Sequence, residues 1–115
     1  MGDRFAHQGK AQLQAVINAQ ESGIDIYPVW NKSFREHSIV KSQPQDLRIE
    51  ADSAVAALKW EGDFYVDADH IGLGTVDGFI NGSNFYTLDV AEFVGQAPTP
   101  ADIDLFIKTN QKYIG

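Results

Sequence analysis

Carboxylate and imidazole side chains gather at the end of one apolar stretch, Phe64 to His70, which reads Phe-Tyr-Val-Asp-Ala-Asp-His. Its apolar beginning predicts a buried strand, in which side chains two residues apart point to the same face. Asp67 and Asp69 therefore share a face, and His70 lies where the strand gives way to a loop. Because unpaired carboxylates are costly at a buried strand end, this cluster indicates metal binding, cation binding or proton transfer.

Two further apolar stretches, Ile24 to Trp30 and Phe85 to Val90, also end in polar residues of catalytic type. In parallel α/β folds, functional residues lie at the carboxyl ends of strands. The set combines imidazole with carboxylate ligands, which suits zinc, manganese, iron or nickel without choosing among them. The residues in question are Asn31, Lys32, Arg35, Glu36 and His37 after the first stretch, Asp67, Asp69 and His70 after the second, and Asp89 and Glu92 at the third.

The same side chains also have a purely structural interpretation. One of Asp67 and Asp69 would cap the following segment, and the other would be solvated. Isolated histidines such as His7 are commonly surface or capping residues, whereas His37 closes a polar loop directly after a strand. The chain contains neither a GxGxxG nor a GxxxxGK[ST] sequence, so nucleotide binding has no support.

Helical apolar spacing and end signals predict four helices around these strands. The predicted order is helix 8–22, strand 24–30, a polar stretch and loop over 31–43, helix 44–60, strand 64–70, short helix 75–80, strand 85–90 and a last helix from 99 to about 114. Alternating elements with short connections predict an α/β fold of repeating βα units with parallel strands. A solenoid is the alternative, but no side-chain consensus recurs, so we expect a barrel or an open sheet.

Composition favours one domain spanning residues 1–115. A formal charge of -7 argues against nucleic acid or an anionic membrane surface as partner. No run approaches the ~20 apolar residues of a membrane span, and the first residues lack the apolar core of a secretory signal. The absence of cysteine is compatible with a reducing compartment, so we expect a cytoplasmic protein.

Four motifs, in order along nearly the whole chain, resemble the tagaturonate/fructuronate epimerase family. The resemblance implies a (β/α) barrel akin to class II aldolases that uses a divalent metal in hexuronate catabolism. Family members are several times longer, so the chain would be an internal portion, about half of a TIM-type barrel. The motifs are Gly2-Asp3-Arg4-Phe5-Ala6, Pro28-Val29-Trp30-Asn31-Lys32-Ser33 with Arg35-Glu36-His37, Asp67-Ala68-Asp69-His70, and Phe85-Tyr86-Thr87-Leu88-Asp89.

The implied reaction inverts a carbinol that lies β to the ketone of a small sugar acid. Its proton is not acidic enough for simple enolisation, so retro-aldol cleavage, rotation of the aldehyde and re-addition is a plausible route. A divalent metal would stabilise the enediolate, and a carboxylate would move the hydroxyl proton. The implied roles are metal ligand for His37, Asp67 and His70, acid or base for Asp3 and Asp69, and substrate binding for Lys32, Arg35 and Asp89.

Two alternatives stay open. An aldolase of the same architecture would release the aldehyde that an epimerase recaptures. A non-catalytic α/β fragment or assembly subunit would instead self-associate through exposed strand edges, since half a barrel leaves those edges unpaired. In either case we expect a homo-oligomer, and we expect the 115-residue chain by itself to be inactive.

Overall fold

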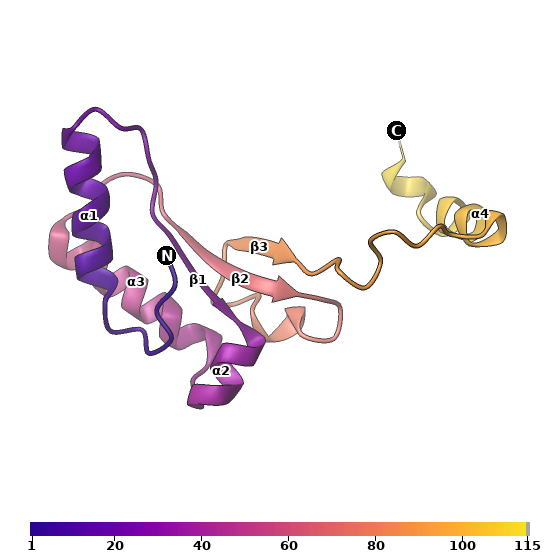
Figure 1. The fold of residues 1–115 in the computed structure, drawn as a ribbon, viewed down its shortest axis with the longest axis horizontal. Coiled ribbons are helices and arrows are strands. Elements are labelled where there is room, and N and C mark those ends of the chain that lie inside the picture. Colours follow the sequence, from indigo (N-terminus) through magenta and orange to yellow (C-terminus); the bar gives the residue numbers. More distant parts are fainter. Residues whose placement is uncertain (115) are drawn as a thin grey trace.

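A parallel three-stranded sheet with helices packed on one face is the centre of the fold (Figure 1). The structure, a computed structural model, describes residues 1–114. The strand order is β1-β2-β3, and both neighbouring pairs are parallel, which confirms the predicted α/β class and its βα units. In chain order the elements are α1 (Gly9–Glu21), β1 (Val29–Ser33), α2 (Phe34–Val40), α3 (Pro44–Leu58), β2 (Tyr65–Ile71), the 3₁₀ turn η1 (Val76–Gly78), β3 (Phe85–Leu88), α4 (Pro100–Thr109) and the 3₁₀ turn η2 (Gln111–Tyr113).

Strand register separates an apolar face of the sheet from a polar one. Trp30 of β1 lies opposite Val66 of β2, and the next pair is Asn31 with Asp67. Trp30 and Val66 turn toward the helices and are buried, and the cluster around them is completed by Leu13, Val16, Leu47, Ala51 and Ala54 from α1 and α3. Because side chains alternate along a strand, Asn31 and Asp67 lie on the face away from these helices, which we call the polar face.

The structure differs from the prediction at β1, which begins later than expected, and at α2, which was not predicted. The strand predicted at 24–30 begins only at Val29, after Pro28, which has no backbone N–H to donate to a neighbouring strand. The segment predicted as polar stretch and loop over 31–43 contains α2, which begins with a capping box. Ser33 Oγ accepts from Glu36 N at 3.2 Å, and the Glu36 carboxylate accepts from Ser33 N at 3.1 Å.

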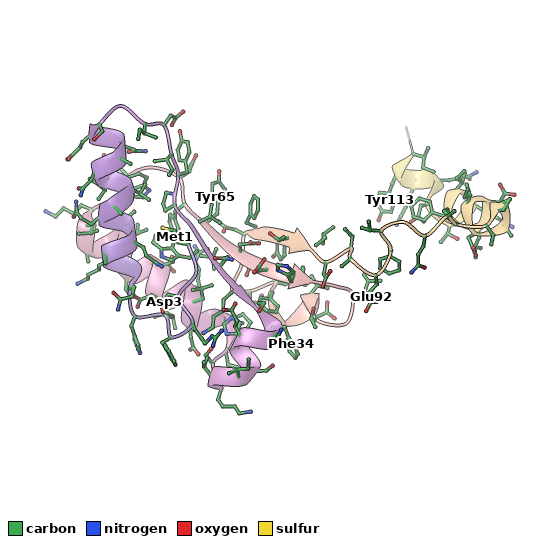
Figure 2. The ribbon with its side chains drawn as sticks, viewed as in Figure 1. Met1, Asp3, Phe34, Tyr65, Glu92 and Tyr113 are labelled. Atoms are coloured by element: carbon green, nitrogen blue, oxygen red, sulfur yellow. The ribbon has the colours of Figure 1, made fainter. Side chains whose placement is uncertain are left out.

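Helix α4 lies beyond an extended segment, at a distance from the sheet (Figure 1). The radius of gyration is 17.9 Å, whereas a compact chain of this length has about 13 Å. The accessible surface is 8157 Å², against about 6,200 Å² for a compact protein of this mass. None of the residues of α4 is buried, and Figure 2 shows side chains standing in the open around it and around Tyr113. A large apolar surface is therefore left exposed. Within residues 1–114, no helix has both the length and the apolar composition of a membrane-crossing segment.

The loop before β3 touches the first turn of α3 at Gly82. A β-carbon at this position would lie 3.1 Å from the carbonyl carbon and 3.2 Å from the carbonyl oxygen of Pro44, which are backbone atoms that cannot rotate away. We expect Gly82→Ala to lower the free energy of unfolding by about 1–3 kcal/mol in urea denaturation. Gly78→Ala is the control, because a β-carbon there meets no atom within 4 Å. Equal losses in the two variants would contradict the close packing at Gly82.

Candidate functional site

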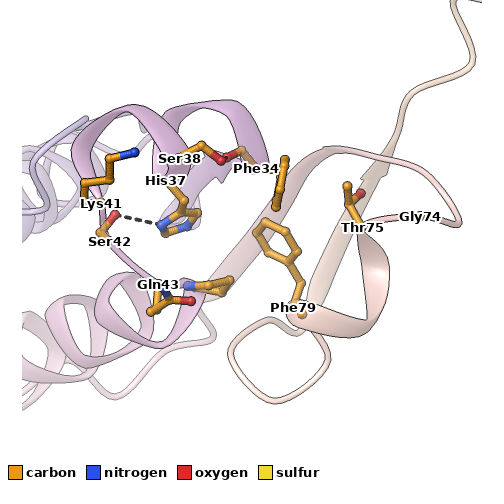
Figure 3. Close-up of a pocket in the computed structure, with 11 residues that line it drawn as sticks. Phe34, His37, Ser38, Lys41, Ser42, Gln43, Gly74, Thr75 and Phe79 are labelled. Atoms are coloured by element: carbon orange, nitrogen blue, oxygen red, sulfur yellow. Dashed lines mark hydrogen bonds between the residues drawn. The ribbon is translucent and has the colours of Figure 1, made fainter.

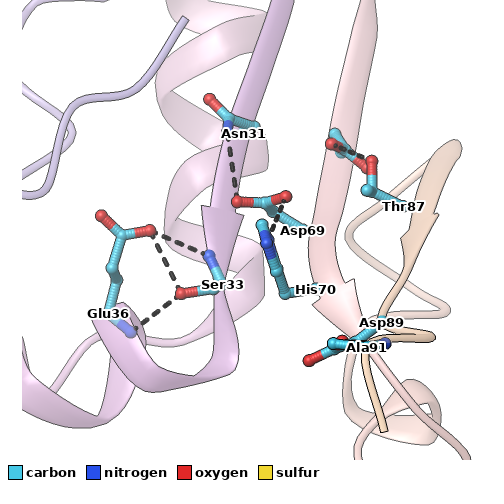
Figure 4. A network of polar contacts seen from close by, with 9 residues as sticks. Asn31, Ser33, Glu36, Asp69, His70, Thr87, Asp89 and Ala91 are labelled. Atoms are coloured by element: carbon cyan, nitrogen blue, oxygen red, sulfur yellow. Dashed lines mark hydrogen bonds and ion pairs between the residues drawn. The ribbon is translucent and has the colours of Figure 1, made fainter. Parts of the chain in front are cut away.

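A network of polar side chains lies on the polar face near the carboxyl ends of the strands (Figure 4). Asp69 connects two elements, because its Oδ1 lies 2.7 Å from His70 Nδ1 and its Oδ2 accepts from Asn31 Nδ2 at 3.3 Å. Thr87 of β3 donates its hydroxyl to Asp67 Oδ2 at 2.8 Å. All three strands thus contribute a side chain to one surface, and Asp67 and Asp69 share a face of β2 as their spacing predicted.

Asp67 is the buried member of this network, with 5% of its surface exposed. Its Oδ1 atom is also buried, and among residues 1–114 it has no hydrogen-bond partner. A buried carboxylate oxygen without a donor costs free energy, so natural folds seldom keep one that has no use. A cation or a ligand hydroxyl would satisfy it.

A β-bulge places His70 beside Asp69. Adjacent residues of a regular strand point to opposite faces, but His70 has a left-handed φ of 53°, and the β2–β3 register shifts between Ala68 and Ile71. This irregularity lets two neighbouring side chains meet, and bulges are common beside active sites. The hydrogen bond to Asp69, together with its negative charge, raises the pKa of His70, which favours an imidazolium–carboxylate pair.

The left-handed backbone at His70 predicts a measurable strain. For a residue with a β-carbon, this backbone conformation lowers the free energy of unfolding by roughly 1–2 kcal/mol, whereas glycine adopts it freely. We expect His70→Gly to be about 1 kcal/mol more stable than His70→Ala, measured by urea denaturation. Both variants lack the imidazole, so their difference reports only on the backbone. Equal stability of the two would show that residue 70 is not held in the left-handed region.

Two of the predicted residues lie on the other side of the sheet. Lys32 is 1% exposed and donates from Nζ to Ser42 Oγ at 2.9 Å. His37 is 4% exposed, its Nδ1 lies 2.8 Å from the same oxygen, and its ring packs edge-on against Phe79. The structure therefore does not bring His37 together with Asp67 and His70. Ser42 follows α2 in a segment for which the sequence predicts a polar stretch and a loop, so no signal pointed to it.

Asp3 has a structural position in the first turn of the chain. Its Oδ2 accepts from the backbone N–H groups of His7 and Gln8 at 2.6 and 2.7 Å, and its Oδ1 accepts from Phe5 N at 3.0 Å. Burial acts to raise the pKa of Asp3, but these three hydrogen bonds outweigh it and hold the pKa below its usual value. The carboxylate is thereby kept ionised, and both of its oxygens are engaged within its own turn. Asp3 is therefore not part of the polar-face network.

The remaining predicted residues are exposed. Arg35 lies in the first turn of α2 and points away from the buried part of the fold. Asp89 follows β3, and its Oδ1 accepts from Ala91 N at 3.1 Å. Neither joins the hydrogen-bond network of Asp67 and Asp69, and their roles in substrate binding stay predictions.

The ligand set expected for a divalent metal does not converge. Within residues 1–114 there is no group of three or more His, Asp or Glu side chains that could hold a metal ion. Of the predicted ligands, Asp67 has one carboxylate oxygen without a hydrogen-bond partner among the described residues, and His70 is hydrogen-bonded to Asp69. His37 lies on the other side of the sheet. His37, Asp67 and His70 therefore do not fit a metal as a set, and the metal requirement stays a prediction.

Fold and site together define an α/β protein of βα units whose parallel sheet carries a carboxylate–imidazole network at the carboxyl ends of its strands. In the comparisons with known proteins, no family model, no curated protein and no solved structure matches this chain.

Proposed function

We propose that this chain forms part of the active site of a metal-dependent hexuronate epimerase that interconverts tagaturonate and fructuronate. The observation that carries the proposal is the unpartnered Oδ1 of the buried Asp67 on the polar face, next to the Asp69–His70 pair. A sugar acid is rich in hydroxyl donors that would satisfy such an oxygen. One of the four family-like motifs, Asp67-Ala68-Asp69-His70, supplies all three of these residues, and β2 carries them on one surface.

The chemistry that these residues support is proton transfer to and from a substrate hydroxyl. Asp69 would accept the proton of the carbinol as the adjacent carbon–carbon bond breaks, and the bond electrons would move to the ketone fragment as an enediolate. Protonated His70 would balance the negative charge beside it. After the aldehyde rotates, the enediolate adds to the opposite face of the aldehyde, and Asp69 returns the proton to the new alkoxide. Asp67 would hold a substrate hydroxyl in place through Oδ1.

The proposal is tested by following tagaturonate by proton NMR in the presence of zinc or manganese. We expect the 115-residue chain alone to be inactive and turnover to require further strands, from a longer polypeptide or an associated chain. Turnover by the monomeric chain would refute the expectation that the active site needs strands beyond these 115 residues. A complete assembly that binds the sugar acid without converting it would refute the epimerase.

A non-catalytic, self-associating subunit is the second candidate, and the exposed stripe of α4 favours it. Ile103, Phe106 and Ile107 lie on one side of the helix and are 45%, 65% and 45% exposed. Apolar surface of this kind is normally covered by a partner. In this case the polar face would have no catalytic role, and the protein would show association without turnover.

Both candidates predict a homo-oligomer at micromolar concentration, measured by light scattering. We expect Phe106→Asp to produce monomers, because a charge in the middle of the stripe cannot be buried without a partner. Ala101→Asp adds the same charge roughly on the opposite side of α4 and should leave the oligomer intact. A stable monomer of the unmodified chain would exclude association through this helix.

A further inference from the structure

A pocket of about 520 Å³ opens on the helix side of the sheet, between α2, the start of α3 and the loop that precedes β3 (Figure 3). Phe34 and Phe79 line it with aromatic rings, and His37, Lys41 and Ser42 line it with polar groups. This pocket is separated by the sheet from the polar face that carries Asp67 and Asp69. Nothing in the proposed epimerase chemistry uses it.

A chain of hydrogen bonds runs from a buried cation to the wall of this pocket. An ammonium only donates, so Ser42 Oγ accepts from Lys32 Nζ at 2.9 Å. We assign the Ser42 hydroxyl hydrogen to His37 Nδ1, 2.8 Å away, because the oxygen then makes two bonds of opposite sense. A neutral imidazole with an accepting Nδ1 carries its hydrogen on Nε2. His37 therefore presents a donor at that atom.

Among the described residues, neither end of this chain has a partner that carries negative charge. His37 is 4% exposed, and its Nε2 has no hydrogen-bond partner among residues 1–114. Lys32 is 1% exposed and forms no ion pair within the described part of the chain. The nearby carboxylates of Glu36 and Asp46 are engaged in the capping boxes of α2 and α3. A buried ammonium without a countercharge and a buried N–H without an acceptor call for an acceptor that carries negative charge.

We propose that this pocket binds a small organic oxyanion, a carboxylate or a phosphate monoester attached to a flat apolar body. The oxyanion accepts from His37 Nε2, lies in the field of buried Lys32, and meets Lys41 at the rim. The apolar body packs against Phe34 and Phe79, which both line the pocket (Figure 3). The site goes beyond the proposed function, and it stands or falls independently of epimerase activity.

The probes are benzoate for a carboxylate, phenyl phosphate for a phosphate monoester, and benzylamine as a cation of the same shape. Amide chemical shifts of the unmodified chain are followed by ¹⁵N NMR up to ~10 mM probe, since weak specific ligands have dissociation constants near ~1 mM. We expect saturable shifts at Ser42, Gly74 and Thr75 with at least one anion and none with benzylamine. Binding of one anion alone identifies which oxyanion the pocket takes.

Two variants separate the pocket from general charge effects. His37→Phe keeps an aromatic ring against Phe79 but removes the donor, and we expect about tenfold weaker binding. His7→Phe is its control, because His7 is an exposed imidazole that belongs to neither site. Lys41→Met removes the exposed cation of the rim without touching the core and should weaken binding about threefold, whereas Lys10→Met on α1 should not. The Lys41 pair keeps the test valid if His37→Phe fails to fold.

Three results would overturn the proposal. The first is the absence of saturable shifts with both anions. The second is equal binding of benzylamine, which would show a purely apolar pocket. The third is unchanged anion binding in both His37→Phe and Lys41→Met. Shifts confined to the polar face around Asp69 would likewise overturn it.

Discussion

The free energy of unfolding is expected to fall by about 2 kcal/mol between about pH 7 and about pH 5, because His37 is buried as a neutral imidazole. Burial, and then the positive charge of Lys32, lower the pKa of His37 to about 4. In the unfolded chain its pKa is about 6.5. Between these values the unfolded state binds more protons than the folded state. The stabilisation is therefore complete above about pH 6.5 and is lost as the pH falls toward 4.

Urea denaturation at a series of pH values measures this effect. His37→Gln removes the titrating group and should flatten most of the dependence in that window. His70→Gln should retain it, because the pKa of His70 is raised by Asp69 and its contribution has the opposite sign. Asp3 cannot mimic the effect, since a carboxylate with a lowered pKa loses its stabilisation only at lower pH. A steep dependence that persists in His37→Gln would show that His37 is not buried in the neutral form.

In an assembly that converts tagaturonate, Asp69→Asn is expected to lower kcat by about 10²–10⁴-fold, the usual contribution of a positioned general base. Asparagine keeps the shape of the side chain and can still accept a hydrogen bond from either Asn31 or His70, but it cannot accept the substrate proton. KM should change little, because the loss falls on the chemical step. Steady-state kinetics by proton NMR provides both numbers.

Asp63→Asn is the matched control for this substitution. Asp63 is exposed in the loop before β2, at the opposite end of the strand from Asp69. We expect its kcat to equal that of the unmodified protein. If Asp69→Asn retains full turnover, the base role is refuted while the epimerase activity stands. If neither protein shows turnover in a complete assembly, it is the epimerase proposal that fails.

Much of the local structure was predictable because short-range rules determine it. Pro44 and the apolar residues spaced along 44–58 predicted α3 to within two residues of its end. Period-two alternation correctly placed Asp67 and Asp69 on one face of a strand. The signal for α2 was also present, since Ser33 and Glu36 stand three residues apart as a capping box requires. This signal is weak, because Ser33 and Glu36 stand among polar residues that also fit a catalytic loop.

The composition of the candidate site, by contrast, was decided by the tertiary structure. Lys32 follows Asn31 directly, so the two side chains lie on opposite faces of β1. The packing of the helices on the face of Trp30 decides that Lys32 is buried and that Asn31 meets Asp69. A bulge with a left-handed residue returns His70 to the face of Asp69, which no alternation rule predicts.

By itself, the sequence determined the α/β class, the parallel strands and the shared face of Asp67 and Asp69, because these depend on residue spacing within one element. Only the tertiary structure decided that His37 lies across the sheet from Asp67, that Asp3 caps a turn, and that Ser42 joins Lys32 to His37. These arrangements depend on strand register and on contacts between distant segments. Such contacts arise from the packing of the whole chain and leave no periodic pattern in the residues that make them.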